Sequence, residues 1–362
     1  MLCMKLLATP SKKDPMKKLI KRIQRKKEEA PTPTRITNDT VAEHRERILA
    51  GGRRFKYPVQ YARHRLVFNT IVVSIVFIIL LIAIGWWQLY PMQNSSAFMY
   101  RLTRIIPIPV AVVNSEQVPY SDYLVQYRGS EYYLNKYGEI KLDSSDGRRQ
   151  LNYIKRQSLD KAEQTTYARQ LARKLNIVVT NDDIDKFINE ERNTANGRVS
   201  QETYDSSMQL YYGETPSDYR LRIANSMLEA KIAFAVDDSA TAQVKQAQTL
   251  VTSTQGDLAA VATQMAKSKG GKVTAGQSGL IDVTSKFSGL RVSEVAKMAK
   301  GSISGPLKST TDDGYYFVKI VDKTGTQVDF LYLHIPLTTF TDEFAGLGSS
   351  HKIQEYIKIS DK

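Results

Sequence analysis

The pattern of apolar and polar positions changes several times along the chain, and the first sharp change is a long uncharged run. Residues 66–90 contain no charged side chain, and the sequence IVVSIVFIILLIAIGWW occupies residues 71–87. About 20 apolar residues in a helix span the hydrocarbon core of a bilayer. The run therefore predicts a transmembrane helix over residues 66–90, with Trp86 and Trp87 at a membrane–water interface.

After a spacer at residues 91–108, residues 109–236 show helical periodicity that follows one short hairpin. The segment VAVVNSEQVP predicts two strands joined by a tight turn. Helices are expected after Thr180, Ser200 and Thr215, because these residue types cap helices. The apolar stripes of these helices indicate a small open bundle.

Residues 237–337 begin with two helical segments and continue through a glycine-rich stretch into strands. The strand segments ISGPLKS, YYFVKIVDK and VDFLYLHIPL are separated by polar and glycine-containing turns. This order predicts a small antiparallel sheet, and a helical segment is expected over residues 338–362. The expected fold class of the whole chain is therefore α+β, with an N-terminal transmembrane helix.

The charge of the chain is concentrated at its N-terminus. The net charge is +14, and residues 1–65 contain 18 Lys and Arg against 6 Asp and Glu. Because the basic residues precede the apolar run, the N-terminus is expected in the cytoplasm and residues 91–362 outside. A cleaved signal peptide is the rival, but 65 residues precede the run and the run is too long.

The tail at residues 1–65 is interpreted as largely disordered. Its basic block, between Lys17 and Lys27, is suited to anionic lipid headgroups near a membrane surface. It has no aromatic interleaving and no recognisable nucleic-acid module, which argues against a nucleic-acid partner. A plain role in setting membrane topology is the simpler alternative.

The composition also argues against several kinds of site. One cysteine, Cys3, excludes an intramolecular disulfide framework and a cysteine-based zinc site. The four histidines are scattered, so no metal centre is expected. Lys272 follows two glycines, but the spacing of a phosphate-binding loop is missing. No cofactor is expected.

Several segments, taken in order, resemble one known family. The opening VAVVNSEQVPYSDYL is similar to the start of SurA/PrsA-type extracytoplasmic foldases, and YYGETPSDYRLRIANSMLEAKI resembles the last helix of their N-terminal domain. The segments GQSGLIDV, SEVAKMAKGSISGPLKS and DGYYFVKIVDK resemble a parvulin-type prolyl isomerase domain, most specifically over residues 299–323. The resemblance covers about two thirds of the chain. It implies a helical N-domain at 109–236 and a parvulin-like domain at 237–337.

The parvulin resemblance is incomplete at the positions that matter for catalysis. The family's domain opens with a histidine-bearing strand, and there is no room for one between Ile232 and Gln243. Its second histidine lies in the strand after the Asp-Gly turn, where this chain has Tyr315 and Tyr316. The resemblance therefore implies weak or lost isomerase activity, with His334 and Tyr316 as the candidate catalytic residues.

Peptide-binding candidates come from apolar positions. Phe287 and Met298 loosely match the family's proline pocket, although core packing is the simpler role for Met298. In the helix that follows the first hairpin, the rings of Tyr120, Tyr123 and Tyr127 fall near one face. Such a stripe usually forms a core, and lining a peptide groove is its alternative role.

The segment at residues 328–337 has two possible partners. A short turn after residues 315–323 favours an antiparallel hairpin, in which 328–337 would take the place of the missing first strand. His334 would then stand near the position of the family's first histidine, where a hydrogen-bonded strand histidine remains the simpler interpretation. The rival is pairing with residues 110–118.

Taken together, the residues and the resemblance favour a membrane-anchored extracytoplasmic folding factor that binds unfolded or secreted polypeptides. Residues 66–90 would contact the lipid bilayer, and the parvulin-like domain would be degenerate. Two alternatives remain open: an active peptidyl-prolyl isomerase, and a non-catalytic structural anchor of an envelope assembly.

Overall fold

The computed structural model describes residues 36–194, 197–267 and 272–360. The chain divides into two compact units, Met1–Ala83 and Ile84–Lys362, and each is described by itself. Within the described residues, His64–Leu89 is the one helical segment that is long and apolar enough to cross a membrane. Its large apolar side chains from Leu66 to Trp87 are exposed, as expected for a segment that faces lipid, whereas Leu89 is buried.

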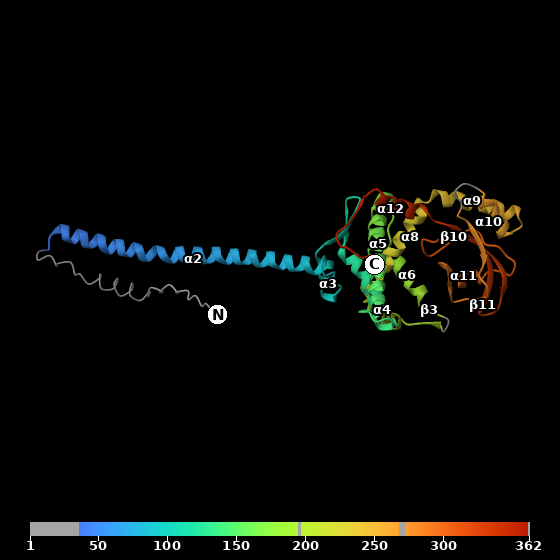
Figure 1. Cartoon of the computed structure of the whole chain (residues 1–362), viewed down its shortest axis with the longest axis horizontal. Helices are drawn as coiled ribbons and strands as arrows, with labels where there is room; N and C mark the ends of the chain where they lie inside the picture. Colours follow the sequence, from blue (N-terminus) through green and yellow to red (C-terminus); the bar gives the residue numbers. More distant parts are fainter. Residues whose placement is uncertain (1–35, 195–196, 268–271, 361–362) are drawn as a thin grey trace, which may run out of the picture. The chain divides into compact units, whose positions relative to one another are not determined.

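This segment is the C-terminal half of a longer helix, α2 (Asn38–Leu89), which is labelled in Figure 1. The sequence predicts a largely disordered tail over residues 1–65, but residues 38–65 are helical; residues 1–35 lie outside the described residues. The helix start is supported by Thr37, whose backbone N–H donates to the Thr40 hydroxyl. The basic block between Lys17 and Lys27 lies outside the described residues.

The second unit begins with the end of α2, from Ile84, and continues into a helical region. Its helices are α3 (Ala97–Ile105), α4 (Tyr120–Tyr137), α5 (Ser145–Leu175), α6 (Asn181–Glu191), α7 (Gln201–Tyr212) and α8 (Pro216–Val236). The predicted caps are confirmed: Thr180 and Thr215 form capping boxes, and Ser200 accepts from the N–H of Thr203. The short strands β3 (Asn193–Thr194) and β4 (Gly197–Arg198) follow α6.

The predicted first hairpin consists of β1 (Pro109–Val113) and β2 (Glu116–Pro119). Its turn requires a left-handed residue, and Asn114 has a φ of 53°. The sequence did not indicate the third strand of this sheet, β12 (Ile353–Glu355), which pairs antiparallel with β1. The C-terminal end of the chain therefore returns to the helical region.

The second part of this unit is an antiparallel sheet with helices. Its elements are α9 (Asp238–Ser253), α10 (Leu258–Ala266), β5 (Thr274–Gln277), β6 (Ile281–Asp282), β7 (Lys286–Phe287), β8 (Leu290–Arg291), α11 (Val292–Val295), β9 (Leu307–Lys308), β10 (Gly314–Lys323) and β11 (Gln327–Pro336). The strand order is β5-β11-β10-β9, and β6 also pairs with β11. The α+β class is thus confirmed.

The hairpin of β10 and β11 forms as predicted. Val318 lies opposite Tyr332, and Tyr316 lies opposite His334. On its other side β11 pairs with β5, so β11 is an interior strand. The rival pairing of residues 328–337 with 110–118 is wrong, because β12 occupies the free edge of β1.

The two faces of β11 pack into different cores, as the alternation of its side chains predicts. Leu333 and Ile335 lie in a cluster with α9 and α10. Phe330 and Tyr332 lie in a cluster with β8 and α11 on the opposite face. Each face is therefore covered by elements from the same part of the chain.

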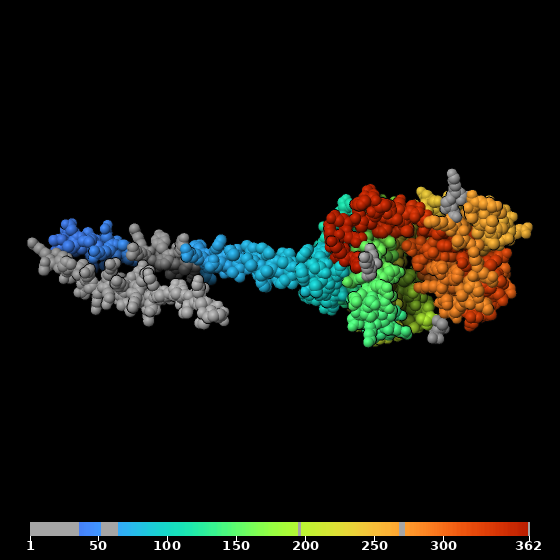
Figure 2. Space-filling view, in the orientation of Figure 1, coloured from blue at the N-terminus to red at the C-terminus, as the bar shows by residue number. Residues whose placement is uncertain are grey.

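The C-terminal segment consists of a helix, α12 (Thr339–Ser349), followed by β12 rather than helix alone. Phe340 of α12 is buried and stacks on Tyr167 of α5, with ring centroids 5.5 Å apart. Figure 2 shows the C-terminal segment, in red, lying against the helical region. Asp237 joins the two parts, because its carboxylate caps α9 at Ala240 and accepts from the backbone N–H of Thr338.

Candidate functional site

The hairpin of β10 and β11 brings both candidate catalytic residues together. Tyr316 and His334 are directly opposed in the antiparallel register, and their rings stack with centroids 4.5 Å apart and planes 18° apart. Tyr316 is buried, whereas His334 is partly exposed. The two side chains come from different strands, and the register of the hairpin places them in contact.

Asp313, in the turn before β10, binds both rings. The Tyr316 hydroxyl donates a hydrogen bond to the Asp313 carboxylate. His334 Nε2 lies 2.9 Å from the Asp313 carbonyl oxygen and 3.5 Å from its carboxylate. Burial, and then the hydrogen bond to Asp313, raise the pKa of Tyr316, so its phenol stays protonated at neutral pH. Tyr316 is therefore a hydrogen-bond donor and not a base.

An apolar wall lies beside this polar group. Phe287, on β7, packs edge-on against Phe330, with ring centroids 5.4 Å apart. The centroid of its ring lies 5.0 Å from that of Tyr332. Met298 packs against the same cluster. The structure thus gathers His334, Tyr316 and the two predicted apolar residues on one face of the sheet.

Two neighbours of this group were not predicted as site residues. Asp313 is in an Asp-Asp-Gly turn, and acidic residues are common in turns. Its sequence position therefore gives no sign of its contact with His334. Tyr332 lies between Phe287 and Tyr316, 6.2 Å from the latter, and its place in the alternation of β11 was the available signal.

The three tyrosines of α4 require a correction. Tyr120, Tyr123 and Tyr127 are 0%, 1% and 2% exposed and belong to the core of the helical region. Tyr120 and Tyr123 pack edge to face, and Tyr123 stacks on Tyr127. They do not line a peptide groove, because neighbouring elements cover the face of α4 that carries the three rings.

An apolar groove lies elsewhere in this unit, against one side of α8. Its cavity of about 480 Å³ is lined by the apolar side chains of Ile177, Phe187, Met227, Ala230 and Phe234, by the cations Lys231, Arg291 and Lys308, and by Ser309 and Thr310. We call it the α8 groove. Lys308 lies 5.2 Å from the Phe234 ring centroid, within cation–π range.

The α8 groove lies between the helical region and the sheet. Two ion pairs close to it connect these parts: Arg291 with Glu190, and Lys286 with Glu191 at 2.5 Å. Because Lys231 also pairs with Asp183, an apolar floor with Lys308 at its edge suits an extended peptide that has apolar side chains and an acidic one. The sequence pattern does not predict this groove, because its residues come from five separate segments.

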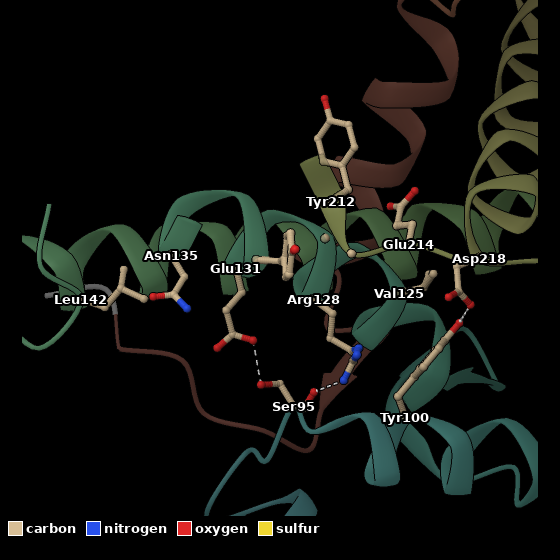
Figure 3. Close-up of a pocket in the computed structure, with 13 residues that line it drawn as sticks. Ser95, Tyr100, Val125, Arg128, Glu131, Asn135, Leu142, Tyr212, Glu214 and Asp218 are labelled. Atoms are coloured by element: carbon tan, nitrogen blue, oxygen red, sulfur yellow. Dashed lines mark hydrogen bonds between the residues drawn. The ribbon is translucent and has the colours of Figure 1, made fainter. Parts of the chain in front are cut away.

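A smaller cavity of about 240 Å³ lies between α3, α4 and the start of α8 (Figure 3). Arg128 donates to the Ser95 carbonyl oxygen, and Ser95 donates to Glu131 at 2.8 Å. Tyr100 donates to Asp218 at 2.6 Å. Arg128, Glu131 and Asp218 therefore hold the residues around α3 in place, whereas Glu214, also drawn in Figure 3, pairs with Arg222 of α8.

The helical region is the part of the chain that a comparison identifies. Residues 62–233 match the family model of the SurA-like N-terminal domain. The match begins next to the apolar segment His64–Leu89 and ends within α8. No curated protein matches the chain.

This match supports the SurA/PrsA-type resemblance of the helical region and indicates a chaperone-like folding factor. It stops before α9, so the sheet and the pair formed by Tyr316 and His334 lie beyond it. The apolar segment and the SurA-like domain are together compatible with membrane anchoring.

Proposed function

We propose that this protein is a membrane-anchored, extracytoplasmic folding factor that holds unfolded exported polypeptides. The observation that carries the proposal is the SurA-like domain at residues 62–233, which is continuous with the apolar segment His64–Leu89. The basic residues before that segment favour a cytoplasmic N-terminus. Clients would then meet the protein as they leave the membrane.

The α8 groove is the proposed client site. Its floor is formed by apolar side chains such as Phe187 and Met227, which can bury the side chains of an unfolded chain without requiring one sequence. Lys231 pairs with Asp183 and Arg291 with Glu190, so among the cations that line the groove Lys308 is the one that adds attraction for acidic segments. Such a site would bind many clients weakly, as a holdase requires.

We further propose that the sheet is a degenerate parvulin-like domain with weak or absent isomerase activity. Prolyl isomerisation must lower a barrier of about 18–20 kcal/mol by stabilising the twisted amide. In the proposed site Tyr316, whose phenol is protonated, replaces a histidine of the family. Its hydroxyl already donates a hydrogen bond to the Asp313 carboxylate and is not free for a substrate. Phe287 and Met298 would still receive an apolar side chain.

An active prolyl isomerase is the second candidate. The observation that favours it is the contact of His334 with both Tyr316 and Asp313 on one face of the sheet. In that case the imidazole and the phenol would donate hydrogen bonds to the twisted amide of a bound proline peptide.

One experiment separates these functions. The full-length chain, in lipid nanodiscs, is added to several unrelated aggregating clients and, separately, to a protein whose refolding is limited by proline isomerisation. We expect suppressed aggregation of every client and an unchanged refolding rate. Failure with all clients would favour the structural anchor, and faster refolding would favour the isomerase.

Two charge-reversal variants localise the activity. Lys308→Glu should weaken the suppression of aggregation, because it places a carboxylate at the groove beside the Phe234 ring. Lys245→Glu, at an exposed position of α9, makes the same charge change away from the groove and should have no effect. Equal effects of the two variants would argue against the α8 groove.

Tyr316→Phe tests the degenerate site. It keeps the ring that stacks on His334 and removes the hydrogen bond to the Asp313 carboxylate, at a cost of about 1.5–3 kcal/mol in stability. We expect client handling and the proline-limited refolding rate to stay unchanged. A wild-type protein that accelerates refolding, with the acceleration abolished by Tyr316→Phe, would establish the isomerase instead.

A further inference from the structure

Helix α3 exposes an apolar surface that the proposed function does not use. Phe98 is 68% exposed and Ile105 is 81% exposed. They are seven residues apart, so they share one face of the helix, and Arg101 lies between them on that face. Ile106, at the C-cap, extends the exposed apolar surface. We call these four residues the outer face of α3.

The opposite face of α3 is fixed to the domain. Met99, Tyr100 and Thr103 are buried, and the Tyr100 hydroxyl donates to Asp218 at the start of α8. Figure 3 shows the hydrogen bond between Tyr100 and Asp218. Because this contact fixes how α3 is rotated about its axis, the outer face cannot turn inward to bury its apolar side chains.

The chain also fixes α3 close to the end of the apolar segment. Only seven residues separate Leu89 from Ala97, and Asn94 donates from its backbone N–H to the Gln88 carbonyl oxygen at 2.9 Å. Leu89 is itself 1% exposed, and its carbonyl oxygen accepts from Tyr120 at 2.6 Å. The last turn of α2 is therefore part of the folded domain that carries α3.

We propose that the outer face of α3 inserts into the interfacial region of the membrane leaflet beside the domain. Phe98 and Ile105 would lie among the upper acyl chains, and Arg101 would lie at the lipid phosphates. The partner is lipid because the end of the apolar segment, with the exposed Trp86 and Trp87, is only a few residues away.

The insertion gives the protein a second membrane contact. A single spanning helix lets a domain rotate and tilt, whereas two contacts limit these motions. The inference rests on the membrane anchoring in the proposed function. The test is therefore built so that loss of the anchor and loss of the α3 contact give different results.

The experiment uses the full-length chain reconstituted in vesicles of phosphatidylcholine and phosphatidylglycerol. In a Cys3→Ser background, an environment-sensitive fluorophore is attached through Phe98→Cys, Ile105→Cys, Leu80→Cys or Tyr133→Cys. Quenching is compared for lipids with a nitroxide near the headgroup and for lipids with a nitroxide near the chain end. Leu80 reports the spanning segment, and Tyr133 is an exposed aromatic control on α4.

We expect the labels at Phe98 and Ile105 to lose roughly half of their fluorescence with the shallow nitroxide and little with the deep one, as for an interfacial helix. The Leu80 label should be quenched by the deep nitroxide, and the Tyr133 label by neither. Quenching at Leu80 without quenching at α3 overturns this inference and leaves the anchor intact.

Three other quenching results would contradict the membrane contact of α3. No quenching at Leu80 contradicts the anchor, and the inference falls with it. Equal quenching at Tyr133 and Phe98 shows that the signal is not specific to α3 and contradicts the proposal. Labels at α3 that change only when an unfolded client is added would assign the outer face to clients instead of lipid.

Discussion

Glu163 is a buried carboxyl group in the core of the helical region. It is 2% exposed, and its Oε1 atom has no hydrogen-bond partner among the residues that the structure describes. Burial, and then the nearby charge of Glu355, raise the pKa of Glu163 to about 8, and Arg156, 3.9 Å away, only partly opposes this. Glu163 is therefore mostly protonated in the folded protein at neutral pH.

The raised pKa of Glu163 makes stability depend on pH. The folded state binds this proton more tightly than the unfolded chain, whose carboxyl titrates near 4.5. The stabilisation of the folded state by the proton on Glu163 is fully present below pH 4.5, and it is lost as the pH rises through about 8. Glu163→Gln should raise the melting temperature at pH 9, with a gain in stability on the order of 1–3 kcal/mol, and flatten its slope between pH 5 and 8.

The control for this prediction is Glu202→Gln, at an exposed position of α7, which should leave the pH profile unchanged. Thermal unfolding followed by circular dichroism gives both profiles. A Glu163→Gln profile as steep as that of the wild type would mean that Glu163 is ionised in the folded protein.

At the level of single residues, the sequence pattern predicts a contact where the pairing of two strands is enough to produce it. His334 and Tyr316 were named from the resemblance and the expected hairpin, and the register confirms that they meet. The role of Asp313 was not predicted, because aspartate is common in turns and its presence there needs no functional explanation. The burial of Tyr123 among other tyrosines depends on which elements cover α4, and the periodicity of one helix does not contain that information.

At the level of elements, the hairpin of β10 and β11 depends on one glycine. Gly314 begins β10 with a φ of 134°, and a Cβ atom there would overlap the backbone of Ile335. Gly314→Ala should therefore destabilise the sheet by about 3 kcal/mol or more, since both the conformation and the close approach exclude a side chain.

The matched control is Gly325→Ala, in the turn at the other end of the same hairpin. A Cβ atom there would meet nothing within 4 Å, so the change should be nearly neutral. Urea unfolding of the two variants measures the difference. Equal stabilities would show that the start of β10 is not held against β11 as described.

Elements with a local signal were predictable, and those that depend on distant partners were not. The capping boxes at Thr180 and Thr215 and the turn at Asn114 are encoded within a few residues. Strand β12 has only three residues, and it is a strand because β1 offers it an open edge. The α8 groove likewise exists only once the two parts of the second unit are packed together.

At the level of the whole molecule, the charge distribution predicts one orientation in the membrane. A reporter that is active only in the cytoplasm should be silent when fused after Lys362, because the basic residues hold the N-terminus inside. The same reporter fused after Ala50, before the apolar segment, should be active. Full activity after Lys362 would reverse the topology and remove exported chains as clients.

The central claim is that the α8 groove holds unfolded clients, and site-specific photo-cross-linking tests it most directly. A photo-reactive phenylalanine analogue replaces Phe187 in the groove or, as a control, the exposed Tyr153 on α5. The full-length chain in nanodiscs is irradiated with a permanently unfolded client or with the same client in its native fold. We expect a cross-link from Phe187 to the unfolded client alone and none from Tyr153. Equal cross-linking at the two positions, or none at Phe187, would contradict it.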